Sequence, residues 1–306
     1  MSPRGFTRSA TWRDSLALMA RETGCDTVLL AVAAMQDHAY STEVDFDTPD
    51  VLDMDDVRAV CEYAKQLGLM VIVKAMVNCR DGYWRAYIRF FDHDVPHEPT
   101  WSEWFDSYGR FVTALAGTAE QAGAQMFCVG CEMVGADHRE TEWRALVSRV
   151  RASYHGLVTY NCDKYQEDKV RWWDAVDLIS SSGYYPIGTM KENFARIKTA
   201  ALREGKPFLF LEAGCPSREG SENCPNNWQH EGRQSLDAQT SWYGFITEMI
   251  LGNPWVRGAA WWDWSAHRLY AADAAPADSG YCVYGKPAAA ILKEYSRQVI
   301  IREGQS

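Results

Sequence analysis

The sequence of 306 residues lacks an apolar run long enough to cross a membrane, since a spanning helix needs roughly 18 to 20 consecutive apolar residues. It also lacks an excess of basic residues: 31 lysines and arginines stand against 41 aspartates and glutamates, which gives a net charge of −10. An acidic protein of this kind is a poor partner for nucleic acid and for anionic membrane surfaces. We therefore expect neither nucleic acid nor a membrane among its partners.

No stretch rich in proline, glycine and serine marks a linker between domains. A chain of this length can bury one large core, and we predict a single domain over residues 1–306. The first nine residues contain no apolar segment of the signal-peptide type. The nine cysteines are irregularly spaced, and many lie in apolar segments, as is typical of buried thiols in a reducing compartment. Both features predict a cytoplasmic location.

Tryptophan, by contrast, is abundant, with 13 residues in the chain. An excess of aromatic residues in an acidic soluble protein fits stacking against sugar rings, which have apolar faces. For any single tryptophan, packing in a large core is the alternative. The composition thus favours an oligosaccharide or polysaccharide as the partner, while the sequence leaves the oligomeric state open.

Apolar runs that read as buried strands alternate with amphipathic segments that read as helices. The expected strands are residues 5–7, 26–33, 69–77, 125–132, 156–161, 177–184, 207–212 and 258–264. The expected helices are residues 9–23, 54–67, 101–122, 140–154, 169–175, 190–204, 235–251 and 287–298. Eight such units in this length predict an α/β fold of the (β/α)8 type, a TIM barrel.

Two of these strands end on a glutamate, Glu132 and Glu212, which that count places on strands four and seven. A carboxylate at the end of a buried strand is costly unless it has partners or a task, and barrel active sites lie at the C-terminal ends of the strands. A pair of carboxylates there can flank a glycosidic bond, one as acid and one at the anomeric carbon. Strand alternation predicts that Gly130 shares the face of Glu132 and that Cys131 faces the helices.

Around these glutamates the sequence resembles glycoside hydrolase family 113, the β-mannanases of clan A. The segments that carry the resemblance are Asp81-Gly-Tyr-Trp-Arg85, Val129-Gly-Cys-Glu132-Met133, residues 172–186, Leu211-Glu212-Ala-Gly214, Trp261-Trp-Asp-Trp264 and Gly285-Lys-Pro287. The resemblance implies that Glu132 is the general acid/base and Glu212 the nucleophile of a retaining enzyme. The chain departs from the family at Cys131, where threonine is usual, and at Ala75, Met76 and Asn78, where proline, histidine and aspartate are expected. These departures bear on the sugar rather than on the chemistry.

Ten further residues are candidates for binding substrate, because they lie at or after strand ends or within the matching segments. They are Lys74, Asn78, Trp84, Arg85, Asn161, Tyr184, Tyr185, Trp228, Trp262 and Trp264. Tyr184 or Tyr185 could donate a hydrogen bond to the nucleophile and keep it ionised. For Lys74 a buried ion pair is the alternative, and for the tyrosines it is packing. Trp228 lies in a long polar segment, residues 216–232, that could close one end of the cleft.

Metal and redox sites find little support in the sequence. The thiols of Cys128 and Cys131 lie three residues apart on a strand and therefore point to opposite faces. The group His93, Asp94, His97 and Glu98 reads as a solvated loop. Cys215 and Cys224 are expected to be free thiols. We expect no metal and no cofactor.

The sequence therefore predicts a retaining β-glycosidase that acts on β-1,4-linked mannose-containing chains. Two alternatives remain open. The same machinery could act on another sugar, as in a β-glucosidase or β-galactosidase, or the barrel could bind sugar without cleaving it.

Overall fold

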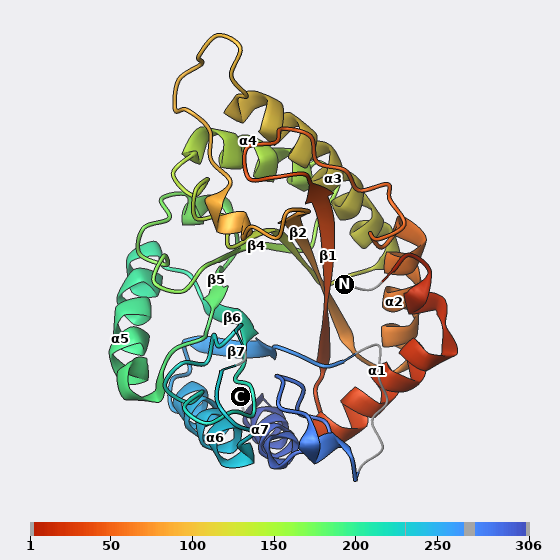
Figure 1. Cartoon of the computed structure of the whole chain (residues 1–306), viewed down its shortest axis with the longest axis vertical. Helices are drawn as coiled ribbons and strands as arrows, with labels where there is room; N and C mark the ends of the chain where they lie inside the picture. The colour runs from red at the N-terminus through yellow and green to blue at the C-terminus, as the bar shows by residue number, and fades with distance from the viewer. Residues whose placement is uncertain (1–2, 230, 266–272, 304–306) are drawn as a thin grey trace. The chain divides into compact units, whose positions relative to one another are not determined.

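In the computed structural model, strands and helices alternate along the chain (Figure 1). The structure describes residues 3–229, 231–265 and 273–303. In this part of the chain the strands are β1 (Thr27–Gln36), β2 (Met70–Cys79), β3 (Met126–Cys131), β4 (Leu157–Cys162), β5 (Ile179–Ser182), β6 (Phe208–Ala213) and β7 (Val256–Trp261). The helices are α1 (Ala10–Thr23), α2 (Met54–Gln66), α3 (Trp101–Ala122), α4 (Glu140–Arg151), α5 (Ile187–Glu204), α6 (Leu236–Leu251) and α7 (Pro287–Glu303). Neighbouring strands pair in parallel, and the α/β class of the TIM barrel is confirmed.

The chain divides into two compact units. The first comprises residues 1–9, 28–66 and 70–181, and the second comprises residues 10–27, 67–69 and 182–306. The prediction of a single domain over residues 1–306 therefore stays a prediction. Among the described residues, no helix is long and apolar enough to span a membrane.

In the first unit, the strands β2, β3 and β4 pair in register, with Ile72 beside Met126 and Met126 beside Leu157. Helices α3 and α4 bring large aromatic side chains into the core of this unit. Trp143 of α4 stacks on Trp172 with the ring centroids 5.0 Å apart, and both side chains are fully buried. Core packing thus accounts for several of the tryptophans.

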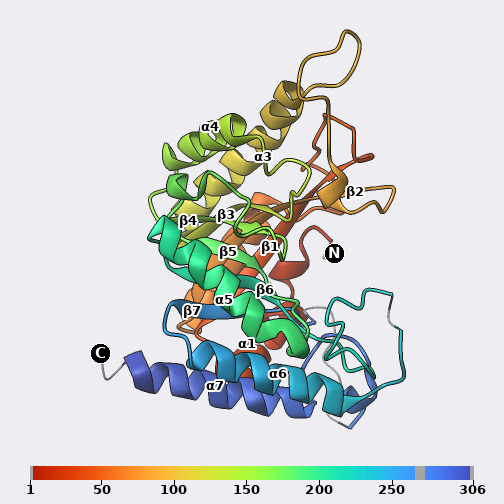
Figure 2. The ribbon, with the colours of Figure 1, turned by 90° about the vertical axis from the view of Figure 1, so that its left-hand side faces the viewer.

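In the second unit, β6 pairs with β7, and Phe208 lies beside Val256. Helices α6 and α7 lie side by side (Figure 2). Helix α1, although it comes first in the chain, packs against α7 and belongs to this unit. The indole of Trp264 donates a hydrogen bond of 3.0 Å to Ser15 of α1.

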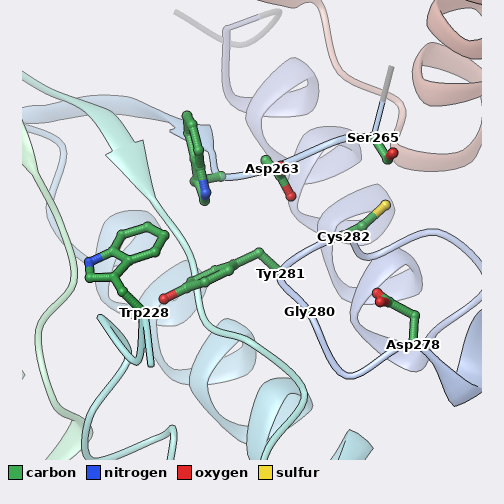
Figure 3. Close-up of a pocket in the computed structure, with 8 residues that line it drawn as sticks. Trp228, Asp263, Ser265, Asp278, Gly280, Tyr281 and Cys282 are labelled. Carbon is green, nitrogen blue, oxygen red and sulfur yellow. The ribbon is translucent and has the colours of Figure 1, made fainter. Parts of the chain in front are cut away.

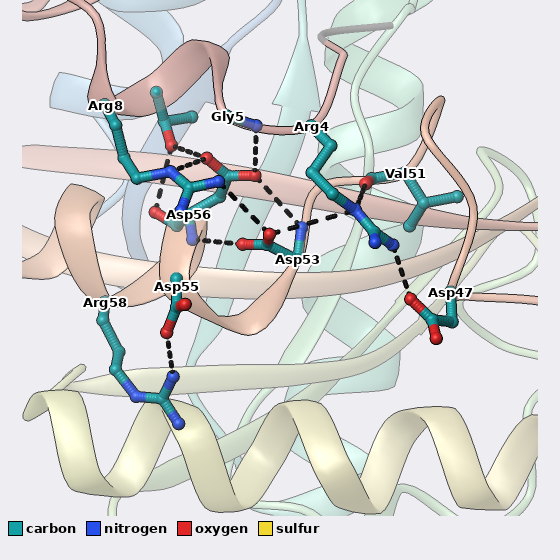
Figure 4. Close-up of polar contacts among 10 residues, drawn as sticks. Arg4, Gly5, Arg8, Asp47, Val51, Asp53, Asp55, Asp56 and Arg58 are labelled. Atoms are coloured by element: carbon teal, nitrogen blue, oxygen red, sulfur yellow. Dashed lines mark hydrogen bonds and ion pairs between the residues drawn. The ribbon is translucent and has the colours of Figure 1, made fainter.

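The expected strand at residues 5–7 is wrong. Gly5 has a left-handed conformation (φ 82°), and Phe6–Arg8 forms one turn of 3-10 helix. The cause is the buried Asp56 of α2, whose carboxylate accepts hydrogen bonds from the Gly5 amide at 2.8 Å and from the Thr7 hydroxyl at 2.7 Å (Figure 4). These bonds hold the segment against α2. The described residues therefore contain seven strands instead of the eight that the sequence predicts.

Two smaller expectations are also wrong. Of the helix expected over residues 169–175, only a 3-10 turn forms, Trp173–Ala175. Gly130 does not share the face of Glu132, because a Cβ atom there would lie 2.9 Å from the ring of Trp143 on α4. The register shift between Cys128 and Cys131 explains the difference, since it breaks the simple alternation along β3.

Candidate functional site

Glu132 follows the last residue of β3 in an unusual backbone conformation. Its φ is 53°, which is uncommon for a residue other than glycine. The Glu132 amide donates a bond of 2.7 Å to the carbonyl of Asn161 at the end of β4. The side chain is largely buried. A strained residue held at a strand end is typical of functional positions.

Two side chains donate hydrogen bonds to the same carboxyl oxygen of Glu132. The indole Nε1 of Trp84 lies 3.1 Å from Oε2, and a guanidinium nitrogen of Arg85 lies 3.0 Å from it. Arg85 also donates to Asn78 Oδ1 at 2.7 Å and to the carbonyl of Val77 at 3.1 Å. The structure thus joins four of the predicted site residues, Asn78, Trp84, Arg85 and Glu132, in one network.

A second network holds the backbone behind Glu132. The amide of Met133 donates to the hydroxyl of Tyr160 at 2.9 Å, and this hydroxyl donates a short hydrogen bond to Asp137. Tyr160 is fully buried and Asp137 nearly so. Burial raises the pKa of Asp137 to about 7, although the bond from Tyr160 acts in the opposite direction. The sequence analysis missed both residues, because they meet only through the fold.

Asp163, just after β4, responds to the charge of Glu132. Its pKa is raised to about 7, first by burial and then by the negative charge of Glu132. Two other candidates, Lys74 and Asn161, are fully buried in this unit. Lys74 lies on β2 directly opposite Cys128 of β3 in the strand register, and Asn161 lies on β4. Asn161 contacts Glu132 through its backbone carbonyl.

In the second unit, Glu212 lies near the end of β6. The hydroxyl of Tyr184 donates a hydrogen bond of 2.8 Å to Glu212 Oε1, and the amide of Gly183 donates to the Glu212 carbonyl at 2.6 Å. Tyr185 makes different contacts, since its hydroxyl accepts a bond of 3.2 Å from Arg196. Tyr184, one of the two predicted tyrosines, therefore donates a bond to Glu212.

A pocket of about 290 Å³ opens in the same unit. It is lined by Trp228, Trp262, Asp263, Ser265, Asp278, Gly280, Tyr281 and Cys282 (Figure 3). The rings of Trp228 and Tyr281 stack with their centroids 4.7 Å apart, and Tyr184 meets Trp228 edge to face at 5.3 Å. Predicted residues Trp228 and Trp262 thus line the pocket. Trp264 does not: its indole donates to Ser15.

The pocket also holds a carboxyl group that the sequence analysis missed. Burial raises the pKa of Asp263 to about 6, with smaller contributions from the charges of Asp278 and Glu212. The adjacent backbone is tightly packed, because a Cβ atom at Gly214 would lie 2.0 Å from the carbonyl oxygen of Trp262. An aromatic wall beside a carboxyl group suits a sugar ring, which offers both apolar faces and hydroxyl groups.

The described part of the chain contains no cluster of three or more histidine, cysteine, aspartate or glutamate residues that could hold a metal ion. The groups that could react are carboxyl groups that accept hydrogen bonds from neighbouring side chains. Each unit presents one glutamate near a strand end whose side chain is engaged in this way. Carboxyl groups of this kind can transfer a proton or attack an electrophilic carbon.

Comparison with known proteins connects this chemistry to carbohydrates. The model of Glycoside Hydrolase Family 113 matches residues 1–286. A structure of a complex of a GH113 β-1,4-mannanase is 47% identical, with a TM-score of 0.95, and the match covers 97% of this chain and 96% of the other. The GH113 β-mannanase AaManA from Alicyclobacillus acidocaldarius, in complex with ManMIm, is 39% identical, with a TM-score of 0.93 and coverage of 97% and 95%.

More distant structures share the fold alone. A β-glucuronidase from Ruminococcus gnavus is 13% identical, with a TM-score of 0.63, and the match covers 94% of this chain and 46% of the other. The search of curated protein sequences found no match.

Proposed function

The chain belongs to glycoside hydrolase family 113, and from this we propose that it hydrolyses β-1,4 bonds between mannose units. The support comes from the family match over residues 1–286 and from two β-mannanases that are 47% and 39% identical over nearly the whole chain. The observation that carries the proposal is the pair of hydrogen-bonded glutamates, Glu132 and Glu212, at the positions where the family motifs fall.

We further propose a retaining mechanism in two steps. In the first, Glu212 attacks the anomeric carbon and forms a glycosyl ester, while Glu132 protonates the oxygen of the leaving sugar. In the second, Glu132 takes a proton from water, and the water oxygen displaces Glu212 from the anomeric carbon. This mechanism requires the two carboxyl groups to lie about 5 to 5.5 Å apart in the working enzyme.

The hydrogen bonds around each glutamate fit these roles. Trp84 and Arg85 both donate to Glu132 Oε2 and hold the carboxyl group in a fixed orientation for proton transfer. Tyr184 donates to Glu212 Oε1 and favours the ionised form that a nucleophile needs. Trp228 and Trp262, which line the pocket of the second unit, would then contact the sugar.

Another sugar specificity is the alternative, because residues 75, 76 and 78 depart from the family pattern. A panel of nitrophenyl β-glycosides together with mannobiose to mannohexaose tests the proposal. We expect turnover of the mannosides and of the manno-oligosaccharides, with little on glucosides and galactosides. Preference for a glucoside or galactoside would establish the alternative, and binding without turnover would indicate an inactive sugar-binding barrel.

The cytoplasmic location and the single domain stay predictions, and with them a preference for short oligosaccharides over polymeric mannan. An enzyme in the cytoplasm would meet imported fragments of a few sugars. The test compares turnover of mannohexaose with turnover of a soluble mannan. Faster internal cutting of the polymer would contradict the preference.

A further inference from the structure

Three exposed aromatic side chains gather on the segment that follows β2. The exposed fractions of Tyr83, Trp84 and Tyr87 are 64%, 39% and 61%. Tyr87 meets both of the others edge to face, with ring centroids 6.4 Å from Tyr83 and 5.9 Å from Trp84. Adjacent exposed aromatic rings are unfavourable in water and typically mark a surface that another molecule covers.

One end of this row reaches the glutamate at the end of β3. The indole Nε1 of Trp84 lies 3.1 Å from Glu132 Oε2, while Tyr83 at the other end is mostly exposed. The row therefore begins at a carboxyl group of the candidate site and leads away from it into solvent. Continuity with that carboxyl group identifies what the row would bind.

The segment is held in place by its own contacts. Arg85–Tyr87 forms a 3-10 turn, and the amide of Gly135 donates a bond of 3.0 Å to the carbonyl of Ala86. Close packing enforces this contact, because a Cβ atom at Gly135 would lie 2.2 Å from the carbonyl oxygen of Ile88. A fixed backbone allows the rings to bind a ligand with little loss of conformational entropy.

We propose that Tyr83, Trp84 and Tyr87 form a binding platform for the sugars on the leaving-group side of the cleaved bond. The inference rests on the proposed role of Glu132, since the residue that protonates the leaving oxygen lies beside the departing sugar. The occupant is the reducing-end part of a β-linked manno-oligosaccharide, whose apolar C–H faces stack on the rings. Tyr83, furthest from Glu132 along the row, contacts a sugar beyond the first leaving unit.

The test uses Tyr83→Ala and Tyr87→Ala in the full chain, with Tyr87→Phe as the conservative variant. Loss of a stacking ring costs on the order of 1.5 kcal/mol, which is roughly a tenfold loss of kcat/KM. We expect this loss on mannohexaose and a smaller one on nitrophenyl β-mannoside, which carries no leaving-group sugar. Tyr87→Phe keeps the ring and restores turnover of mannohexaose.

Product analysis on a reducing-end-labelled mannohexaose reports which side of the bond is affected. Weaker binding on the leaving-group side shifts the chain, so that the alanine variants release shorter labelled fragments. Phe91→Ala is the matched control, because Phe91 is 55% exposed on the same segment and its ring lies against His93 instead of the row. This control keeps the wild-type product pattern.

The outcomes separate this inference from the proposed function. If the wild type cleaves neither nitrophenyl β-mannoside nor manno-oligosaccharides, the proposed function fails. If the wild type cleaves both, but Tyr83→Ala and Tyr87→Ala leave chain-length dependence and fragment lengths unchanged, only the platform is overturned. Longer labelled fragments from the variants would place the row on the opposite side of the bond.

Discussion

The two glutamates of the candidate site have different surroundings. Glu132 lies in a left-handed conformation and accepts hydrogen bonds from an indole and a guanidinium group, in a network that includes Asn78. Glu212 lies within β6, accepts a bond from the neutral hydroxyl of Tyr184, and belongs to the unit that holds the aromatic pocket. The first arrangement fixes the orientation of a carboxyl group that would transfer a proton, and the second places the other carboxyl group in the unit whose pocket would hold the sugar.

The largest expected difference between the two surroundings comes from removing each carboxyl group. Glu212→Ala should abolish turnover of every substrate, because without the nucleophile no glycosyl ester forms. Glu132→Ala should retain more activity on nitrophenyl β-mannoside than on mannohexaose, because nitrophenolate leaves without protonation. Measurements of kcat/KM for both variants on both substrates check this. Equal losses of the two variants on nitrophenyl β-mannoside would contradict the assigned roles.

Removing the side chains that donate hydrogen bonds to each glutamate should change kcat/KM on the two substrates in the same pattern, by smaller factors. Arg85→Met removes a charged donor from Glu132, and hydrogen bonds to charged groups contribute about 1.5 to 3 kcal/mol. We therefore expect kcat/KM on mannohexaose to fall by roughly 10-fold to 100-fold, and by less on nitrophenyl β-mannoside. Tyr184→Phe should lower kcat/KM by about the same factor on both substrates, since every substrate needs the nucleophile.

Arg144→Met is the control for the arginine variant. Arg144 forms an ion pair with Asp174 on the surface of the same unit, at 2.8 Å. Its loss should leave the ratio of kcat/KM on mannohexaose to kcat/KM on nitrophenyl β-mannoside at the wild-type value. A changed ratio in this control would mean that the Arg85 result reflects a general weakening of the unit.

The network behind Glu132 should matter to activity as well as to stability. Tyr160→Phe removes the hydroxyl that accepts from the Met133 amide, whereas Tyr154→Phe removes a similarly buried hydroxyl that donates to the Ala124 carbonyl at 2.8 Å. Both variants should lose about 1 kcal/mol of unfolding free energy. Only Tyr160→Phe should lose several-fold in kcat/KM on mannohexaose. Similar activities of the two variants would reduce Tyr160 to a packing role.

Asp137 provides a pH dependence of stability. Burial raises its pKa to about 7, so that its carboxyl group is protonated in the folded chain at pH values where it is ionised in the unfolded chain. The folded chain therefore binds more protons between about pH 4 and pH 7, and its stability falls as pH rises through that window. The contribution is at most about 1.4 kcal/mol per pH unit.

The test measures the free energy of unfolding by denaturant from pH 4 to pH 7. Asp137→Asn should reduce its decrease with rising pH, and Asp94→Asn, at an exposed position, should leave the decrease unchanged. The comparison with the wild type is needed because Asp163 and Asp263 are shifted in the same direction. An unchanged slope in Asp137→Asn would show that this carboxyl group is ionised in the folded chain.

Local signals explain where prediction from the sequence was accurate. The expected helix over residues 101–122 matches α3, because Thr100 and Glu103 form a capping box and Gly123 ends the helix in a left-handed conformation. The glutamates could be located in the same way, since each ends an apolar run. These features depend only on residues close in the chain.

Contacts between distant residues explain the rest. Thr7 is drawn to Asp56, and Tyr160 to Asp137, by hydrogen bonds that span 49 and 23 positions of the chain. No pattern of alternation contains this information. The register shift in β3 likewise turned Gly130 toward α4, which the simple period of a strand could not reveal. Sequence reasoning thus placed the two glutamates near strand ends and missed Asp137, Tyr160 and Asp263 beside them.

The most direct measurement of the central claim is covalent trapping of the glycosyl ester. A 2-deoxy-2-fluoro-β-mannosyl fluoride slows the second step more than the first, so that the ester accumulates on the nucleophile. Peptide mass spectrometry of the trapped wild-type enzyme should find one fluorosugar on the peptide that contains Glu212, bound to Glu212 itself. A fluorosugar on any other residue would contradict the account.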